Sequence, residues 1–383
     1  TEPYFPADPK VFTDTGCNLF PPAPIYGVGP WYISQYTQNE QMVLEPNPYY
    51  TGDLKPQVDQ IIVKEYKDPN TMSLAVQSGE IDVAWRILSP EQLAPLKSIS
   101  GLTVATLTGG GIRFLDINHT MAPTNDPNVD KAIASLIDRN AIVDTVYSGA
   151  VTPIWSMVPP GFLGANEAFD TTYAAPNIDA AKKFLEASGY SASNPLKLDV
   201  WYPPEHYGAS TVAAMQLIKT QLEASGEIQV NLQSQEWSTY VKALIGGKSY
   251  PVGILGWFFD FPDSSNYLDP FVFNGGQGTN VTVAQSGSTT GVPITGTFQT
   301  DATNLVNLLS QADVEQDPAK RTTEYQQAQQ LTADMVLTVP LYYVPEHLVY
   351  RSNIHGLSSY ALPESLNVGA NIEFNYSTLS KTP

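Results

Sequence analysis

Residues 196–234, LKLDVWYPPEHYGASTVAAMQLIKTQLEASGEIQVNLQS, contain the pattern that decides the fold of this chain. The first and last seven residues largely alternate apolar and polar side chains, as half-buried strands do. Between them, Val212, Met215, Ile218 and Leu222 repeat at helical spacing. A strand, a helix and a strand of these lengths predict a right-handed βαβ unit in a parallel sheet, and therefore an α/β fold.

Short strands dominate the first hundred residues instead. WYISQY (31–36), QMVLEP (41–46) and QIIVKEY (60–66) are rich in β-forming residues and are separated by turn residues. Asp68-Pro69 then combines an N-cap with a proline at the first helical position, which predicts a short helix. The pattern changes at Gly109–Gly111, which we interpret as the crossing between two domains. A phosphate-binding loop is disfavoured there because no P-loop lysine follows.

The second half continues the alternation of helices and strands. Asp126-Pro127 and Asp317-Pro318 each open an amphipathic helix, and VGILGW (252–257) predicts a third strand of the parallel sheet, buried on both faces. Residues 274–300 are polar and rich in glycine, so we expect a long surface loop before a helix over 301–313.

Composition narrows the class of protein. The chain has 383 residues and a formal net charge of −19, from 38 acidic and 19 basic residues. This acid excess repels phosphate backbones and anionic lipids, which disfavours binding to nucleic acid or to a membrane surface. Charged residues make up only 15%, and a surface built from uncharged polar residues suits a location outside the cytoplasm. Cys17 is the single cysteine, so no intrachain disulfide forms.

Aromatic and acidic residues follow the predicted strands of the second domain. Ligands of open α/β sheets bind beyond the carboxyl ends of the strands, so these residues are expected on one binding rim. Flat rings together with carboxylates suit an amine or a hydroxyl-rich ligand. The candidates are Tyr202, Glu205, His206 and Tyr207 after the first strand, Glu236 and Trp237 after the second, and Trp257, Phe258, Phe259, Asp260, Asp263, Asn266 and Tyr267 at and after the third.

Structural roles are the alternative for several of these residues. Trp237 lies on the apolar side of its helix, which favours a core role, Glu236 is a candidate helix cap, and Asp263 follows a proline in a turn. Asp260 ends a buried strand, where a carboxylate needs a partner, so we favour a binding role over a loop cap. An enzyme would pair Asp260 with Asp263 or Glu205, as glycoside hydrolases pair carboxylates.

Other catalytic patterns are missing from the sequence. No G-x-S-x-G elbow marks a nucleophilic serine. The four histidines, His119, His206, His347 and His355, lack the spacing of zinc ligands. We therefore expect no catalytic residues, no metal and no cofactor.

Several stretches together resemble the peptide/nickel class (family 5, cluster C) of extracytoplasmic solute-binding proteins of ABC importers. Members of that class begin with further strands of lobe I and a peripheral second domain, to which nothing here corresponds. The resemblance therefore implies a chain that lacks this N-terminal part. The matching stretches are GVGPW (27–31), LEPNPYYTGDLKPQVDQIIVKEYKDPNTMSLAVQSGEIDVAW (44–85), FLDINHT (114–120), VDKAIASLIDRNAIVDTVYSGA (129–150), GWFFDFPDSSNYLDPF (256–271) and VPLYYVPEHLVYRSNIHGL (339–357).

This resemblance implies a two-lobe periplasmic-binding-protein-like fold (type II). Lobe I would comprise residues 1–108 completed by 345–383, and lobe II residues 109–344. The expected function is to capture a peptide-like or other small polar solute and deliver it to a membrane permease without catalysis. The protein would be a monomer in the periplasm or another extracytoplasmic space. Anchoring through a lipoprotein signal outside this sequence is an alternative.

The resemblance also assigns roles on the rim. The position of Asp260 in GWFFDFPD implies that it holds the ammonium of a peptide, and His206 is the candidate for the peptide carboxylate. An oligosaccharide remains the alternative ligand. The complete set of expected ligand-binding residues is Asp260, Trp257, Phe259, Tyr202, His206, Tyr207, Trp237 and Tyr267.

Overall fold

The computed structural model describes residues 24–85, 88, 90–246, 249–273, 297–357 and 376–382. The chain divides into two compact units. Unit 1 comprises residues 1–105, 347–362 and 372–383, and unit 2 comprises residues 106–346 and 363–371. Cys17, most of the proline-rich arm and residues 274–296 of the expected loop lie outside the described residues.

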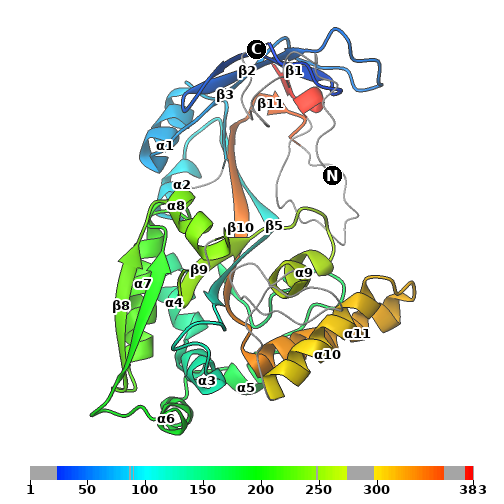
Figure 1. The fold of residues 1–383 in the computed structure, drawn as a ribbon. Helices are drawn as coiled ribbons and strands as arrows, with labels where there is room; N and C mark the ends of the chain where they lie inside the picture. Colours follow the sequence, from blue (N-terminus) through cyan, green and yellow to red (C-terminus); the bar gives the residue numbers. More distant parts are fainter. Residues whose placement is uncertain are drawn as a thin grey trace, which may run out of the picture. The chain divides into compact units, whose positions relative to one another are not determined.

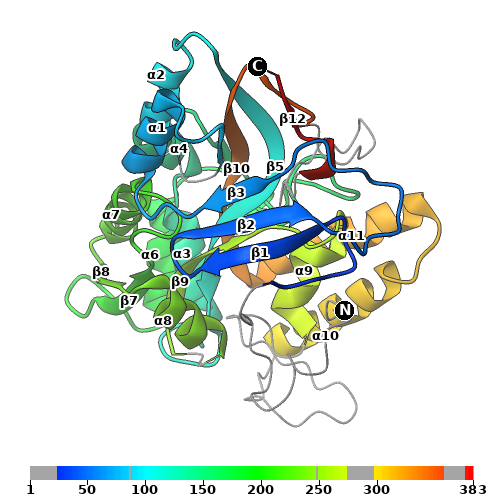
Figure 2. The same cartoon turned by 90° about the horizontal axis from the view of Figure 1, so that it is seen from above.

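Unit 1 contains the short strands predicted near the start of the chain. β1 (Trp31–Thr37), β2 (Gln41–Pro46) and β3 (Ile61–Lys64) form an antiparallel sheet in that order, and Figure 2 shows them side by side. Two short strands, β11 (Ile354–His355) and β12 (Ser380–Lys381), also pair antiparallel. A single 3-10 turn, Tyr376–Thr378, precedes β12.

Two helices and the end of a long strand complete unit 1. α1 (Pro69–Ser78) begins where predicted, because the Asp68 side chain accepts a hydrogen bond from the Thr71 amide, and it ends at Gly79 in the left-handed conformation. β4 (Val83–Trp85) pairs with the last residues of β10 (Thr338–Arg351). Val349 of β10 packs in a small apolar core with residues of α1 and of α2 (Pro90–Leu96).

The main sheet has the strand order β4-β10-β5-β9-β7-β8, with β6 (Thr152–Pro153) beside β10. Two connections between the units lie inside strands, because β5 (Leu102–Ile117) and β10 extend across the division. β7 (Leu196–Tyr202) pairs parallel with β8 (Ile228–Ser234) and with β9 (Val252–Trp257), as predicted. β5 extends the sheet in the opposite sense, since it pairs with β9 antiparallel.

Helices cover this sheet in unit 2, and Figure 1 shows their order along the chain. α3 and α11 begin at the aspartate N-caps Asp126 and Asp317 that the sequence predicts. α10 begins at Thr297, so the expected loop over 274–300 ends four residues too late. The helices are α3 (Pro127–Leu136), α4 (Arg139–Tyr147), α5 (Asp170–Tyr173), α6 (Ile178–Ala187), α7 (Ser210–Glu223), α8 (Trp237–Val241) with a π-helical turn (Lys242–Gly246), α9 (Ser265–Val272), α10 (Thr297–Ala312) and α11 (Pro318–Met335).

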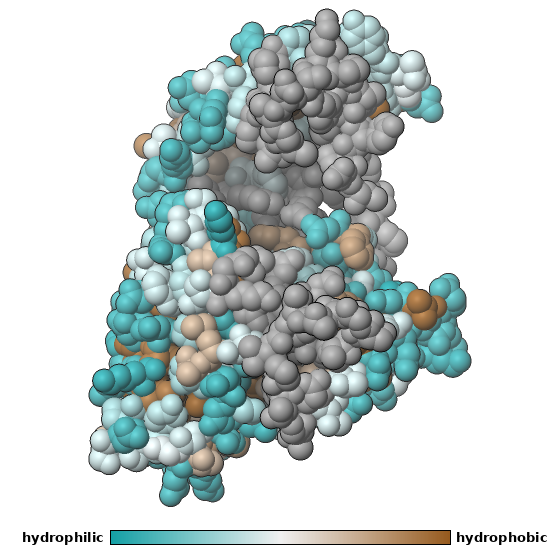
Figure 3. Space-filling model, in the orientation of Figure 1, coloured by the Kyte–Doolittle hydropathy of each residue, from teal (hydrophilic) through white to brown (hydrophobic). Residues whose placement is uncertain are grey.

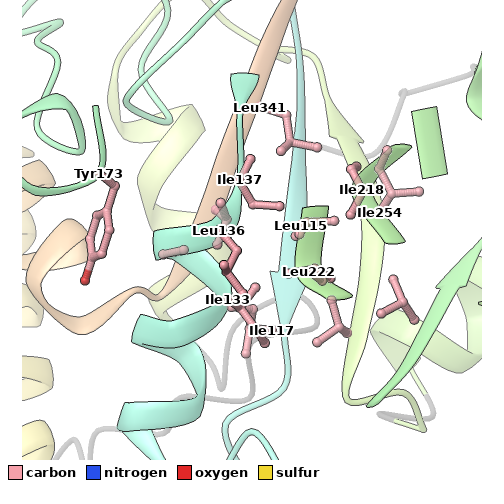
Figure 4. Close-up of a cluster of buried hydrophobic side chains, with 14 of the residues drawn as sticks. Leu115, Ile117, Ile133, Leu136, Ile137, Tyr173, Ile218, Leu222, Ile254 and Leu341 are labelled. Carbon is pink, nitrogen blue, oxygen red and sulfur yellow. The ribbon is translucent and has the colours of Figure 1, made fainter. Parts of the chain in front are cut away.

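The core of unit 2 lies between these helices and the sheet. In Figure 4, side chains of α3 and α7 point toward Leu115 and Ile117 of β5 and toward Ile254 of β9. These side chains are at most 1% exposed. Because a fully buried leucine or isoleucine contributes roughly 1.5–3 kcal/mol, this packing fixes the strands whose ends carry the candidate site.

In Figure 3, the coloured surface at the lower right, where Figure 1 places the ends of α10 and α11, is mostly hydrophilic. Among the described residues, no helix has both the length and the apolar character needed to cross a membrane.

Candidate ligand-binding site

Two of the three strand ends that the sequence analysis singled out lie next to one another. Tyr202 at the end of β7 is in register with Ser234 at the end of β8, whereas Trp201 of β7 is in register with Gly253, the second residue of β9. The predicted rim therefore consists of the adjacent ends of β7 and β8 and of the end of β9, which lies farther along the sheet. Glu236 caps α8 by accepting hydrogen bonds from the Ser238 and Thr239 amides, which confirms the structural alternative for this residue.

One group of rings on the rim joins the loops after β7 and β8. The imidazole of His206 stacks on the indole of Trp237, with ring centroids 3.5 Å apart and planes 2° apart. Tyr207 meets both rings edge-on, at 4.7 Å from His206 and 5.6 Å from Trp237. Trp237 is half-buried and His206 is exposed. The structure thus brings three of the expected ligand-binding residues into one aromatic cluster.

Arg113 of β5 lies against this cluster, and sequence reasoning missed it. Its guanidinium carbon is 4.2 Å from the centroid of the Tyr207 ring and 5.4 Å from that of Phe258. Arg113 is directly opposite Gly256 of β9, whose amide donates a 2.7 Å hydrogen bond to the Tyr207 hydroxyl. The available signal was a single arginine in the apolar strand IRFLDI. Its position beside Tyr207 depends on the pairing of β5 with β9, which no local pattern predicts.

The buried side-chain amide of Asn266 contacts Asp260 and its loop. Asn266, which is 5% exposed, accepts hydrogen bonds through Oδ1 from the Asp260 amide at 2.9 Å and from Trp257 Nε1 at 3.2 Å. Its Nδ2 atom lies 3.5 Å from Asp260 Oδ2. Asp260 is itself exposed. Asn266 therefore fixes the loop after β9 while the Asp260 carboxylate faces solvent.

Asp263 is bound within the protein. Arg321 of α11 donates two hydrogen bonds to its carboxylate, at 2.7 and 3.0 Å, and the Ser265 amide donates a third at 2.9 Å. Burial opposes ionisation, but the hydrogen bonds from Arg321 and Ser265 outweigh it and lower the pKa of Asp263. This carboxylate tethers the loop to α11 and begins α9, as the structural alternative predicted.

Three other expected ligand-binding residues lie in the interior of unit 2. Tyr202, Phe259 and Tyr267 are 8%, 6% and 0% exposed. Phe162 packs against Phe259 and Tyr267, with centroids 5.4 and 4.9 Å away. The structure therefore separates these rings from exposed Asp260 and His206, and places them beneath the rim.

The glycines at 109–111 belong to β5 and provide space for these rings. The hydroxyl of Tyr267 donates a 2.7 Å hydrogen bond to the Gly110 carbonyl, and a side chain at Gly110 would collide with the rings of Tyr267 and Phe259. A Cβ atom at Gly111 would lie 2.7 Å from the Phe258 ring. Close packing on a strand, rather than phosphate binding, explains this run.

The part of the chain that the structure describes contains no cluster of three or more His, Cys, Asp or Glu residues suited to a metal ion. His119 is a buried core histidine. Its Nδ1 atom lies 3.0 Å from Asp130 Oδ2 and its Nε2 atom 3.0 Å from the Leu337 carbonyl.

Comparison with known proteins decides the family. Residues 2–279 match the family described as bacterial extracellular solute-binding proteins, family 5 Middle. The chain belongs to this family. Family 5 solute-binding proteins are extracytoplasmic components of transport, which agrees with the resemblance and with the location predicted from composition.

Two curated family 5 relatives are named for oligopeptides. The periplasmic oligopeptide-binding protein OppA of Haemophilus influenzae is 30% identical over 259 residues, which cover 66% of this chain and 47% of OppA. The oligopeptide-binding protein OppA of Bacillus subtilis is 26% identical over 338 residues, covering 86% of this chain and 58% of OppA. The chain therefore spans about half the length of these relatives.

Solved structures of family 5 proteins share the fold. DppA of Helicobacter pylori, in complex with the peptide STSA, superposes with a TM-score of 0.76 at 20% identity, covering 93% of this chain and 63% of DppA. The dipeptide-binding protein of Pseudoalteromonas sp. SM9913, in complex with Met-Leu, has a TM-score of 0.76 at 21% identity. The match covers 95% of this chain and 66% of that protein. The chain thus has the α/β fold of two-lobe periplasmic binding proteins.

Proposed function

We propose that this chain is the ligand-binding part of an ABC importer component that captures a short peptide or a peptide-like solute. The observation that carries the proposal is the Asp260 carboxylate, exposed on the rim of unit 2 and oriented by buried Asn266. The names of the relatives, which refer to oligopeptides and dipeptides, support the same class of ligand.

Asp260 is suited to bind an ammonium group. No lysine or arginine among the described residues forms an ion pair with it. Its loop is already ordered by Asn266, so a ligand would not have to order it on binding. A charge-assisted hydrogen bond from a peptide amine is typically worth about 1.5–3 kcal/mol.

Binding without catalysis is favoured over a carboxylate-pair hydrolase. The proposed partner Asp263 is ionised and paired with Arg321, so it has no proton to give a leaving group. Glu205 is exposed on the loop after β7 and forms no ion pair among the described residues. Membership of a transport family supports the same conclusion.

An oligosaccharide is the second candidate ligand. The stacked rings of His206 and Trp237 offer a flat surface of the kind that sugars bind. Such a ligand would depend little on the charge of Asp260, which makes the two classes separable by experiment.

The remaining assignments are part of the same proposal. Units 1 and 2 correspond to lobes I and II, which close on the ligand, and the partner is a permease in the membrane. The protein acts as a monomer, with a lipoprotein anchor as the alternative to a free periplasmic form.

Calorimetric titration with tripeptides tests the proposal. Asp260→Asn keeps the shape of the side chain and removes its charge, so affinity should fall by about 10- to 100-fold, since each 1.4 kcal/mol is tenfold. N-acetylation removes the ammonium charge of the peptide, so it should lower the affinity of the native protein by a similar factor. It should change the affinity of Asp260→Asn little. Glu205→Gln is the matched control on the same rim and should leave affinity unchanged. Peptide affinity that survives Asp260→Asn, or cleavage of any ligand, would contradict the proposal.

A further inference from the structure

Arg113 is a nearly buried cation that forms no ion pair among the described residues. The residue is 6% exposed. Its one hydrogen bond is from Nη1 to the carbonyl of its own neighbour, Ile112, at 2.9 Å. A guanidinium has five N–H donors, and removing it from water without a partner is costly. No carboxylate among the described residues lies within ion-pair distance.

The acid closest to it in the strand does not supply the missing charge. Asp116, also on β5, is buried, and neither of its carboxylate oxygens has a hydrogen-bond partner. Burial raises the pKa of Asp116 well above its usual range, which disfavours the charged form of this carboxyl. Arg321 of α11 shows the contrast, because its guanidinium binds both oxygens of Asp263.

The surroundings of Arg113 orient the guanidinium. The rings of Tyr207 and Phe258 flank it at cation–π distances, and the absence of a side chain at Gly256 makes room for Nη1. A Cβ atom at Gly256 would lie 2.6 Å from Nη1. Among the described residues, the Nε and Nη2 atoms donate no hydrogen bond. These two donors form the pair that matches a carboxylate in bidentate geometry.

Arg113 and Asp260 lie on the same stretch of the rim. Gly256, opposite Arg113, precedes Asp260 by four residues, and four residues span at most about 14 Å when fully extended. A short peptide has its ammonium and carboxylate separated by a comparable length, since each residue adds about 3.5 Å.

We propose that the Arg113 guanidinium binds the carboxylate of the ligand and that the site selects short zwitterionic peptides, with the ammonium at Asp260. This inference rests on the proposed function. It replaces His206, the carboxylate partner suggested by the resemblance, with a residue from β5.

A double-difference titration tests the role of Arg113. A tripeptide and its C-terminal amide are titrated against the native protein, Arg113→Met and Arg113→Lys. Amidation should weaken binding to the native protein at least tenfold, to Arg113→Met less than twofold, and to Arg113→Lys by an intermediate factor. Arg351→Lys in unit 1, where the arginine donates to the Val76 carbonyl, is the control and should keep the full amidation effect. If Arg113→Met does not fold, Arg113→Lys carries the comparison.

An NMR titration separates failure of this inference from failure of the proposed function. The side-chain Nε–Hε signal of Arg113, assigned by its loss in Arg113→Lys, is followed on adding acetyl-alanine, a carboxylate without an ammonium, and acetyl-alanine amide. The signal should move with the acid only. Tripeptide binding with equal amidation effects in native and Arg113→Met proteins overturns the role of Arg113 and leaves the proposed function standing. If no peptide binds, the proposed function fails, but a shift of the Arg113 signal with acetyl-alanine still supports a carboxylate site at Arg113. The absence of any shift overturns that site.

Discussion

Arg139 and Arg113 are both buried arginines of unit 2, 2% and 6% exposed, but they have different partners. Arg139 donates from Nε to the Pro340 carbonyl at 2.7 Å and from Nη1 to the Tyr173 carbonyl at 3.2 Å. It thereby joins the start of α4 to β10 and α5. Burial lowers the pKa of Arg139 to about 10, so it remains charged at pH 7. Arg113 makes no hydrogen bond to a distant segment. Burial alone does not distinguish a structural cation from a binding one, whereas its partners do.

Two carboxylates of the loop after β9 show the same contrast. Asp263 is bound by Arg321 and by the Ser265 amide, and so connects α9 with α11. Asp260, three residues earlier, meets only the Asn266 amide and faces solvent. The protein uses Arg139 and Asp263 to hold elements together, and it leaves Arg113 and Asp260 available on the rim.

The largest expected effect is on Arg139. Arg139→Met leaves the Pro340 and Tyr173 carbonyls without donors, and the loss of two charge-assisted hydrogen bonds should cost about 3 kcal/mol of unfolding free energy. Arg113→Met should cost less than about 1 kcal/mol, since it breaks one local hydrogen bond. Urea titration followed by tryptophan fluorescence measures both. Equal losses would mean that Arg113 is also structural.

Asp263→Asn should have the next largest effect on stability. It removes the negative charge and one of the two oxygens that accept hydrogen bonds from Arg321, whose side chain is 22% exposed, and we expect a loss of about 1–2 kcal/mol. Asp260→Asn should change the unfolding free energy by less than about 0.5 kcal/mol, as is usual for an exposed site. Thermal unfolding of the two variants compares them directly. A larger loss for Asp260→Asn would assign that residue to capping its own loop.

Gly256→Ala tests the contact between Arg113, Tyr207 and β9. The new Cβ atom would lie 2.6 Å from Arg113 Nη1 and 2.9 Å from the Tyr207 ring, so both side chains must move. Such overpacking typically costs about 1–3 kcal/mol of unfolding free energy. Because the arginine side chain is flexible, we expect a loss of about 1 kcal/mol for this variant. The affinity for a tripeptide, measured by calorimetry, should fall as well. Gly29→Ala, where nothing lies within 4 Å of the new atom, is the control.

The last expected effect depends on pH and concerns Asp269 of α9. Burial, followed by repulsion from Asp313 and Asp263, raises the pKa of Asp269 to about 8, so the folded protein holds a proton that the unfolded chain releases near pH 4. This contribution to stability is present below pH 4 and is lost as the pH rises to 8. Asp269→Asn lacks the titrating group.

The stability of Asp269→Asn relative to the native protein should therefore increase by about 1–2 kcal/mol between pH 4 and 8, after allowance for partial exposure. Urea titrations across this range measure the difference. Asp179→Asn, at an exposed position of α6, should show no such trend. A flat difference for Asp269→Asn would mean that the carboxyl is ionised in the folded protein.

Much of the local structure follows from the sequence because its causes are local. The dipeptides Asp68-Pro69, Asp126-Pro127 and Asp317-Pro318 each begin a helix, since an aspartate cap and a proline at the first position act within one turn. Alternating side chains in 196–202 and 228–234 likewise predict the parallel pair β7 and β8. The location of Asp260 on the rim needs only the end of β9, which the apolar run over 252–257 marks.

Tertiary structure alone decided which charges are available. The antiparallel pairing of β5 with β9 places Arg113 opposite Gly256, and the packing of α9 on β5 buries Tyr267 beneath the rim. A local reading of FDFPD favours a turn role for Asp263, but only the fold supplies its partner, since Arg321, 58 residues beyond Asp263, donates to its carboxylate. Contacts between residues so far apart in the chain depend on how the elements pack, which periodicity and turn signals do not encode. The sequence by itself therefore determined the elements, the family resemblance and the exposed carboxylate, while the fold determined the partner of each charge.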